Sequence, residues 1–239
     1  MSVNELRQAC REYADSFIET QQESFRRILA FSDWEGKYKT MAPEYEATQV
    51  RILGEFFDSG LVYRGLKPVH WDWGSKTALA DAEVEYDSFR TEQVYVKFPY
   101  PTAPEFLQEA ADGRDLFVLI WTTTPWTLPA NQAIAMNPSL SYELVEVDGD
   151  ALVMAQGRRD ETLADCEIEE FEVLATFEGR ELVGELGDDP ERAAEHPWLD
   201  QPSHLLPAHY VTLDQGTGCV HTAPGHGQED FMLGQQYDL

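Results

Sequence analysis

The sequence predicts an α+β protein, in which an N-terminal helical segment and a β-ribbon linker precede a strand-rich, barrel-like domain. Three observations support this fold class. Apolar residues recur at helical spacing only near the N-terminus, short strand-like runs broken by glycine and proline fill the rest, and no internal repeat occurs. We therefore expect a helical segment over 1–60, a ribbon over 61–88 and the strand-rich domain over 89–239.

Two helices are predicted in the first 60 residues. In the first, over 5–30, Leu6, Cys10 and Tyr13 recur near helical spacing with charged residues between them. The second runs over 43–59, because Pro43 suits a first helical turn and Gly60 suits a C-terminal cap. Both helices are expected to serve as scaffold.

After residue 60 the pattern changes to short strands. The strongest candidate is 115–122, whose centre is a continuous apolar run. Asp148 and Gly149 predict a two-residue hairpin turn, and the acidic, proline-containing stretch 185–204 predicts a solvated loop. The other strand candidates are 61–63, 69–71, 83–86, 94–98, 133–136, 142–147, 151–154, 172–177 and 210–213.

Length and composition narrow the class of protein. The 239 residues are 43% hydrophobic and 12% aromatic, which excludes wholesale disorder and allows a proper core. The longest apolar run, 116–121, is far too short to span a membrane. The polar N-terminus contains no signal-peptide core, so we expect a cytoplasmic protein.

The charge is strongly negative and unevenly distributed. There are 44 acidic and 17 basic residues, a net charge of −27, of which −22 falls in residues 91–239. Taken alone, this excess argues against a nucleic-acid partner and against an anionic membrane surface. Since only five basic residues are lysine, we hypothesise a high-salt habitat, in which screening removes the self-repulsion.

Two segments contain residue types suited to chemistry. The first, 121–131 (WTTTPWTLPAN), follows the strongest strand and places four threonine hydroxyls within six positions, while two prolines stiffen the loop. Such a loop can offer hydroxyls and amides to an oxygen-rich substrate without charge. The alternative is an ordinary threonine-rich strand and turn.

The second segment, 216–230, combines glycines, two histidines and an acidic pair, and allows several interpretations. His221, His226 and Asp230 could ligate zinc, although the helical histidine spacing that makes such motifs specific is absent. Alternatively, Asp230 pairs with an ammonium group while His221 orients a water or a leaving oxygen. A capped turn with surface histidines is the plain structural alternative.

Other familiar chemistry lacks support in the sequence. Cys10, Cys166 and Cys219 are far apart and form no Cys-x-x-Cys pair, so neither a disulfide framework nor a cysteine zinc site is expected. Cys219 lies close to His221, but its apolar neighbour favours a buried thiol over a nucleophile. There is no phosphate-binding glycine loop with its lysine and no G-x-S-x-G motif.

Together, WTTTPWTLPAN (121–131) and GTGCVHTAPGHGQEDF (216–231) resemble the two signature loops of the editing domain of isoleucyl-tRNA synthetases, a class I family. KPVHWDWGSKTALADAEVEY (67–86) is similar to the ribbon that leads into that domain, and the resemblance covers essentially the whole chain. The chain departs from some members at 72–75, where DWGS replaces a Cys-x-x-Cys zinc pair. HIGH-like and KMSKS-like motifs are missing, so an excised or free-standing editing insertion without ATP-dependent ligase activity is expected.

The resemblance implies hydrolysis of the aminoacyl ester of mischarged valyl-tRNA(Ile). By position in the motifs, Asp230 binds the substrate ammonium, and His221 contacts the amino acid side chain or excludes the larger one. The expected pocket residues that position the ribose or water are Thr122, Thr123, Thr124 and Asn131, with Thr127 a further pocket residue. Trp126 is expected to stack on the terminal adenine, and Trp121 more often serves the core.

The resemblance also implies partners and rivals. No cofactor and no metal are implied, and the expected partners are the 3′ end of tRNA(Ile) carrying valine and the remainder of an isoleucyl-tRNA synthetase. DNA is not expected as a partner, because the site would read a ribose hydroxyl that DNA lacks. A membrane is not expected either, because the net charge is −27. Two alternatives stay open: a tRNA-binding fragment that does no hydrolysis, and a metal-dependent hydrolase.

Overall fold

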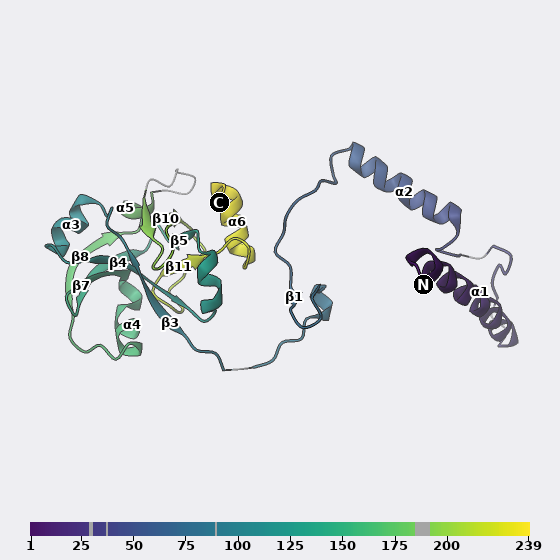
Figure 1. Cartoon of the computed structure of the whole chain (residues 1–239), viewed down its shortest axis with the longest axis horizontal. Helices are drawn as coiled ribbons and strands as arrows, with labels where there is room; N and C mark the ends of the chain where they lie inside the picture. Colours follow the sequence, from purple (N-terminus) through teal and green to yellow (C-terminus); the bar gives the residue numbers. More distant parts are fainter. Residues whose placement is uncertain (29–30, 37, 89, 185–191) are drawn as a thin grey trace. The chain divides into compact units, whose positions relative to one another are not determined.

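The computed structural model describes residues 1–28, 31–36, 38–88, 90–184 and 192–239 (Figure 1). It divides into two compact units, Met1–Leu66 and Lys67–Leu239, which are described separately. The boundaries at residues 60 and 88 remain predictions. No helix in the described ranges is long and apolar enough to cross a membrane.

The first unit contains the two predicted helices. α1 spans Val3–Arg27 and opens with a capping box between Ser2 and Glu5, which satisfies the first free amides. α2 spans Pro43–Asp58 and has Pro43 in its first turn, as predicted. No residue of either helix is buried. The last two residues of the predicted first helix, 29–30, lie outside the described residues.

A five-stranded sheet forms one layer of the second unit. Its strand order is β3-β4-β7-β6-β8, with β4 and β7 parallel and the other pairs antiparallel. The predicted hairpin turn joins β6 to β7, and Asp148 and Gly149 both have the positive φ that such a turn requires (53° and 91°). The bounds are β3 Val94–Pro99, β4 Leu116–Thr122, β6 Ser141–Val147, β7 Asp150–Ala155 and β8 Glu172–Glu178.

A four-stranded sheet, β11-β5-β10-β9, forms the other layer, and β1 and β2 form a small ribbon. β5 runs parallel to β10 and antiparallel to β11. The strands are β1 Trp71–Asp72, β2 Thr77–Ala78, β5 Ala133–Met136, β9 Ala193–Glu195, β10 Pro202–Pro207 and β11 Cys219–Thr222. The helices are α3 Glu105–Ala111, α4 Arg159–Asp165, α5 Arg180–Val183 and α6 Gln228–Tyr237, with 3₁₀ turns η1 Asp81–Glu83, η2 Pro125–Ala130 and η3 Gln156–Arg158.

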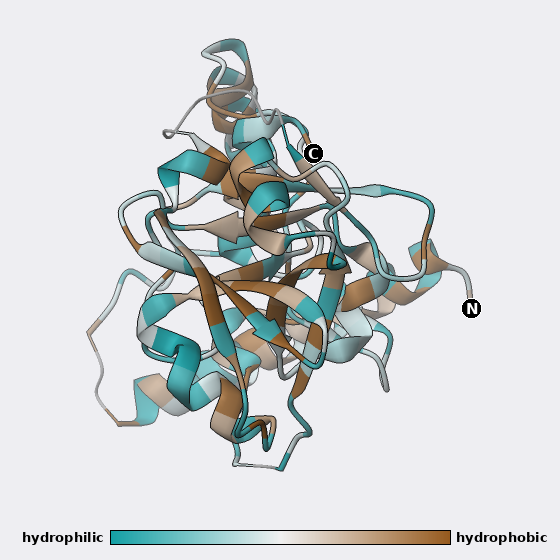
Figure 2. Cartoon of the chain, turned by 90° about the vertical axis from the view of Figure 1, so that its left-hand side faces the viewer, coloured by the Kyte–Doolittle hydropathy of each residue, from teal (hydrophilic) through white to brown (hydrophobic). Residues whose placement is uncertain are grey.

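The predicted α+β class is confirmed, whereas the barrel-like form is not: none of the sheets formed by the described strands closes. The five-stranded sheet ends at β3 and β8, and the four-stranded sheet ends at β11 and β9. The main core is shared between these two sheets, since Ile120 of β4, Ile134 of β5 and Leu205 of β10 belong to one buried cluster. Hydrophobic colouring accordingly follows the central strands in Figure 2.

Several predicted elements differ from the structure. Residues 61–63, 83–86 and 210–213 are not strands. Within the predicted loop 185–204, residues 185–191 lie outside the described part. The rest is not entirely loop, because it contains β9 and the first residues of β10. β10 contains proline and polar residues and shows no period-two pattern, so it was not predicted. It forms because it pairs with β5 and β9, and not because of local strand propensity.

Candidate functional site

A cavity of about 340 Å³ brings the two predicted segments together. From the first segment it is lined by the threonines that follow β4 and by Thr127 in η2; from the second it is lined by His221 of β11 and Asp230 of α6. The connection between β10 and β11 supplies much of the remaining lining. The threonines contributed by the first segment are Thr122, Thr123, Thr124 and Thr127.

Hydroxyl groups fix the shape of the threonine loop. The Thr122 Oγ1 atom accepts a hydrogen bond from the Thr124 amide at 3.0 Å, and the two side-chain oxygens lie 3.2 Å apart. The Thr127 hydroxyl lies 2.9 Å from the Thr124 carbonyl oxygen. Part of the threonine content therefore serves the turn itself, as the plain structural alternative required.

A buried chain of hydrogen bonds joins this loop to His221. Asn131 places its amide nitrogen 2.8 Å from Nδ1 of His221 and 2.8 Å from the Ala133 carbonyl oxygen. Because an amide nitrogen only donates, Nδ1 accepts, and the proton of the neutral ring sits on Nε2. Nε2 lies 2.9 Å from the Thr127 hydroxyl, which in turn donates to Thr124.

This arrangement limits what His221 can do. Burial, together with the nearby His196 and His226, lowers its pKa to about 4. The ring is therefore neutral near pH 7, and both nitrogens are engaged within the protein. With its nitrogens occupied, His221 offers the cavity ring carbons rather than a proton donor or a base.

Asp230 lies in the first turn of α6 and is half-buried. Its Oδ2 accepts a hydrogen bond from the Ala223 amide at 3.2 Å. Burial raises the pKa of this carboxyl, and the Ala223 hydrogen bond opposes that effect. Within the described residues Oδ1 makes no hydrogen bond, so one oxygen is available to a ligand.

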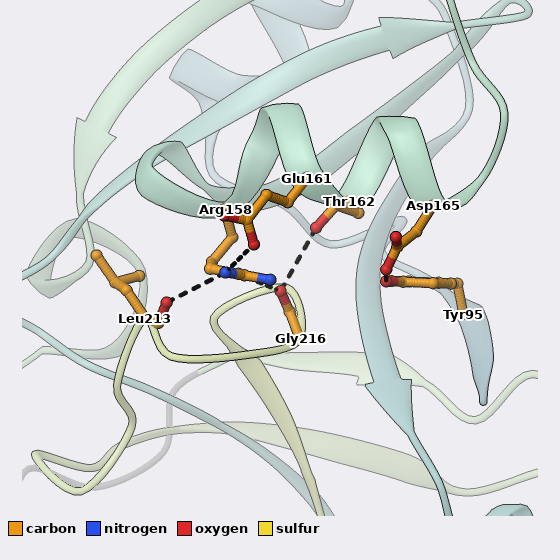
Figure 3. A network of polar contacts seen from close by, with 7 residues as sticks. All are labelled: Tyr95, Arg158, Glu161, Thr162, Asp165, Leu213 and Gly216. Carbon is orange, nitrogen blue, oxygen red and sulfur yellow. Dashed lines mark hydrogen bonds and ion pairs between the residues drawn. The ribbon is translucent and has the colours of Figure 1, made fainter. Parts of the chain in front are cut away.

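Arg158, at the end of η3, holds the wall formed by the loop before β11 (Figure 3). This buried guanidinium donates from Nε to the Gly216 carbonyl at 2.9 Å and from Nη1 to the Leu213 carbonyl at 3.3 Å. Thr162 of α4 also reaches the Gly216 carbonyl at 3.4 Å, and Glu161 pairs with the guanidinium. The wall is therefore pinned through its backbone, which leaves it little freedom to move.

Two glycines let that wall pass close to the five-stranded sheet. Gly216 and Gly218 both have φ of +76°. A Cβ at Gly216 would lie 3.1 Å from the Trp121 ring, and one at Gly218 would lie 2.3 Å from the Cβ of Ala155. Tyr95 of β3 donates to Asp165 of α4 at 2.8 Å, which joins this helix to the edge of the same sheet (Figure 3).

One asparagine and two tryptophans differ from the sequence-based expectation of which residues line the pocket. Asn131 is completely buried and is not among the residues that line the cavity, so it acts through His221. Trp126 is 66% exposed and also lies outside the lining. Trp121, expected mainly in the core, does line the cavity and donates to Gln93 at 3.1 Å.

The metal alternative receives no support from the donor geometry. Among the described residues, no group of three histidine, cysteine or acidic side chains is placed to hold a metal ion. Ligation by His221 would also require breaking its bonds to Asn131 or Thr127. The thiol of Cys219 is buried, and its desolvation raises its pKa well above the ordinary value, so it is not an activated nucleophile.

Comparisons with known proteins agree on one family. Residues 1–221 match the family model "tRNA synthetases class I (I, L, M and V)". The chain is 46% identical to the isoleucine–tRNA ligase of Brevibacillus brevis (100% of this chain, 24% of that protein) and 44% identical to that of Petrotoga mobilis (100% and 24%). It thus spans about a quarter of the length of these curated relatives.

A solved structure shows a more distant likeness. The editing domain of the cytosolic leucyl-tRNA synthetase of P. knowlesi aligns with 63% of this chain and 68% of its own, at 12% identity and a TM-score of 0.47.

Proposed function

Since the chain belongs to the class I tRNA synthetases, we propose that it is an editing domain that hydrolyses the ester of valyl-tRNA(Ile). The observation that carries this proposal is the single cavity formed by the threonine loop, His221 and Asp230. The whole-chain identity to isoleucine–tRNA ligases of several bacteria supports the choice of tRNA.

A need for such an activity follows from the size of the substrates. Valine and isoleucine differ by one methylene, which is worth only about 1–3 kcal/mol in a pocket, and isoleucyl-tRNA synthetase is the standard example of this limit. A second site that admits the smaller product and excludes the larger one corrects the remaining errors. The ester is already reactive, so the site must position it and water rather than supply a strong nucleophile.

Asp230 is the proposed binding group for the α-ammonium. Its free Oδ1 can accept from the ammonium while Oδ2 stays fixed by the Ala223 amide. Burial raises its pKa, and a bound cation would favour the ionised form. The cost of burying the carboxylate is thus offset when the correct charge arrives.

The remaining roles follow from the lining. Thr123 and Thr124 supply hydroxyl groups for the terminal ribose or the attacking water. His221 presents ring carbons to the aliphatic side chain and limits its size, and Asn131 holds that ring through Nδ1. The exposed face of Trp126 is proposed to stack on a base of the tRNA end.

The proposed partners are the 3′ end of tRNA(Ile) carrying valine and the remainder of an isoleucyl-tRNA synthetase, in the cytoplasm. The net charge of −27 gives this chain little attraction for phosphates, so other parts of the enzyme must hold the tRNA. Ribose hydroxyl contacts at the cavity make RNA rather than DNA the substrate.

The test is deacylation of valyl-tRNA(Ile) and isoleucyl-tRNA(Ile) by the 239-residue chain. We expect release of valine and negligible release of isoleucine. Asp230→Ala should abolish the reaction while the circular dichroism spectrum stays unchanged. Asp238→Asn is the control, since it removes the same charge at the other end of α6, where the αL backbone suits asparagine.

Two results would replace the proposal. Intact esters in complexes that form normally would favour the non-catalytic tRNA-binding alternative. Activity that disappears with a chelator and returns with zinc would favour the metal-dependent alternative. Full activity of Asp230→Ala would remove the assigned role of this carboxylate.

A further inference from the structure

The hydroxyl of Tyr210 is buried at the cavity and lacks a hydrogen-bond partner within the described residues. Its close neighbour Thr222 acts to lower the pKa of Tyr210, but the Thr222 hydroxyl donates to the Val220 carbonyl oxygen at 3.4 Å and forms no hydrogen bond of good geometry with the phenol. An unsatisfied buried hydroxyl destabilises a folded protein, because it loses its hydrogen bonds to water without replacement. Such a group at the wall of a cavity needs an explanation, and a ligand that completes its hydrogen bonding provides one.

Two buried tyrosines elsewhere in the domain provide a comparison, because one has hydrogen-bond partners and the other does not. The Tyr142 hydroxyl accepts from the Asn137 amide at 2.9 Å and donates to the Gly218 carbonyl at 2.8 Å. The Tyr100 hydroxyl also lacks a partner within the described part of the chain, but Tyr100 does not line the cavity. Tyr100 therefore provides a matched comparison, with the same chemical group and the same lack of a partner at a different place.

Two acidic side chains act on Tyr210, with Asp230 contributing more than Glu229. Burial raises the pKa of Tyr210 to about 12, and the negative charge of Asp230 contributes to that increase. The phenol therefore keeps its proton at neutral pH. Tyr210 and Asp230 lie close enough to interact electrostatically and line the same cavity, yet no hydrogen bond joins them.

We propose that the Tyr210 hydroxyl is a second acceptor for the substrate α-ammonium, beside Asp230. An ammonium has three N–H donors, so the free Oδ1 of Asp230 alone leaves donors that a second acceptor in the cavity can satisfy. The phenol oxygen accepts one of them and keeps its own proton. This assignment rests on the proposed function of the cavity as an aminoacyl site, and makes the site selective for a free α-amino group.

The experiment uses two adenosine probes in which the 3′-ester is replaced by a stable amide. One carries L-valine, and the other carries 3-methylbutanoate, which has the same isopropyl group and no ammonium. Binding to the 239-residue chain is measured by calorimetry for the wild type, Tyr210→Phe and Tyr100→Phe. Urea unfolding of the three proteins checks that removing either unsatisfied hydroxyl leaves stability equal or higher.

We expect Tyr210→Phe to bind the valine probe about tenfold to a hundredfold more weakly, as for the loss of one hydrogen bond to a charged group. Its affinity for the probe without ammonium should stay the same, and Tyr100→Phe should leave both affinities unchanged. Equal weakening for both probes, unchanged affinity for the valine probe, or wild-type protein that does not distinguish the probes would each overturn the assignment.

Binding and hydrolysis are read separately. If the amide probes give the expected pattern while valyl-tRNA(Ile) stays intact, the ammonium site stands and the proposed hydrolysis fails. If valyl-tRNA(Ile) is hydrolysed equally by wild type and Tyr210→Phe, and their affinities for the valine probe agree, hydrolysis stands and the Tyr210 assignment fails.

Discussion

Replacing His221 with glutamine tests whether the ring is held neutral in the folded protein. His221 is 8% exposed, and its pKa falls from an ordinary 6.5 to about 4 through burial and two neighbouring histidines. Glutamine keeps an amide that can bond with Asn131 and Thr127, but it does not titrate. The variant therefore removes one ionisation without removing the hydrogen-bonding position.

The direction of the effect follows from proton binding. Between pH 6.5 and 4 the unfolded chain protonates this histidine and the folded chain does not, so the free energy of unfolding falls as the pH falls. The full difference of about 2.5 pH units corresponds to roughly 3 kcal/mol. Between pH 7 and pH 4.5, about 2 kcal/mol of that loss should be observed.

The assay is urea unfolding of wild type and His221→Gln at pH 7 and pH 4.5. The many carboxylates contribute equally to both proteins, so the difference between the two pH-dependent losses isolates His221. We expect the variant to lose about 2 kcal/mol less than wild type, and replacement of the exposed His209 by glutamine serves as the control. An identical loss in wild type and His221→Gln would refute the reasoning.

Three further predictions concern the cavity wall and the charge. Gly218→Ala should lower the free energy of unfolding by about 2–4 kcal/mol in urea, because its Cβ would overlap Ala155, whereas Gly113→Ala meets open space and should cost about 1 kcal/mol. Arg158→Lys should cost about 1–3 kcal/mol and raise the KM for valyl-tRNA(Ile); unchanged kinetics would show that Gly216 keeps its place without the guanidinium. The unfolding midpoint should rise from dilute buffer to molar KCl as screening reduces self-repulsion; an unchanged midpoint would remove the high-salt hypothesis, which rests on charge alone and is not supported by the comparisons.

Periodicity and turn chemistry predicted much of this fold. The hairpin at Asp148 and Gly149 and the strand at Ala133–Met136 were predictable because local residue preferences and the tertiary structure agree there. β10 was not predictable in this way, since it depends on two partner strands. Whether a sheet closes into a barrel also cannot be predicted from a pattern of strands, because the pattern does not show which strands lie at the edges.

The candidate site shows the same division. The two segments that line the cavity stand out by residue type, and the structure brings them together. The role of Asn131 could not be read from the sequence, because its burial and its bond to His221 appear only in three dimensions. Tyr210 gave no signal either, since it lay within a run predicted to be a strand. Arg158 was missed because a buried cation has no distinctive local pattern.

The site depends on contact between two layers, which determines how it can discriminate. β11 packs against β4, and the bond between His221 and Thr127 joins the loops that follow β4 to the other sheet. The wall at Gly216 is held through its backbone carbonyl, so the shape of the cavity does not rely on mobile side chains. A cavity of fixed shape selects by size, while Asp230 selects by charge. Changes in the walls should therefore alter which ester is accepted, and changes at Asp230 should alter how fast any ester is hydrolysed.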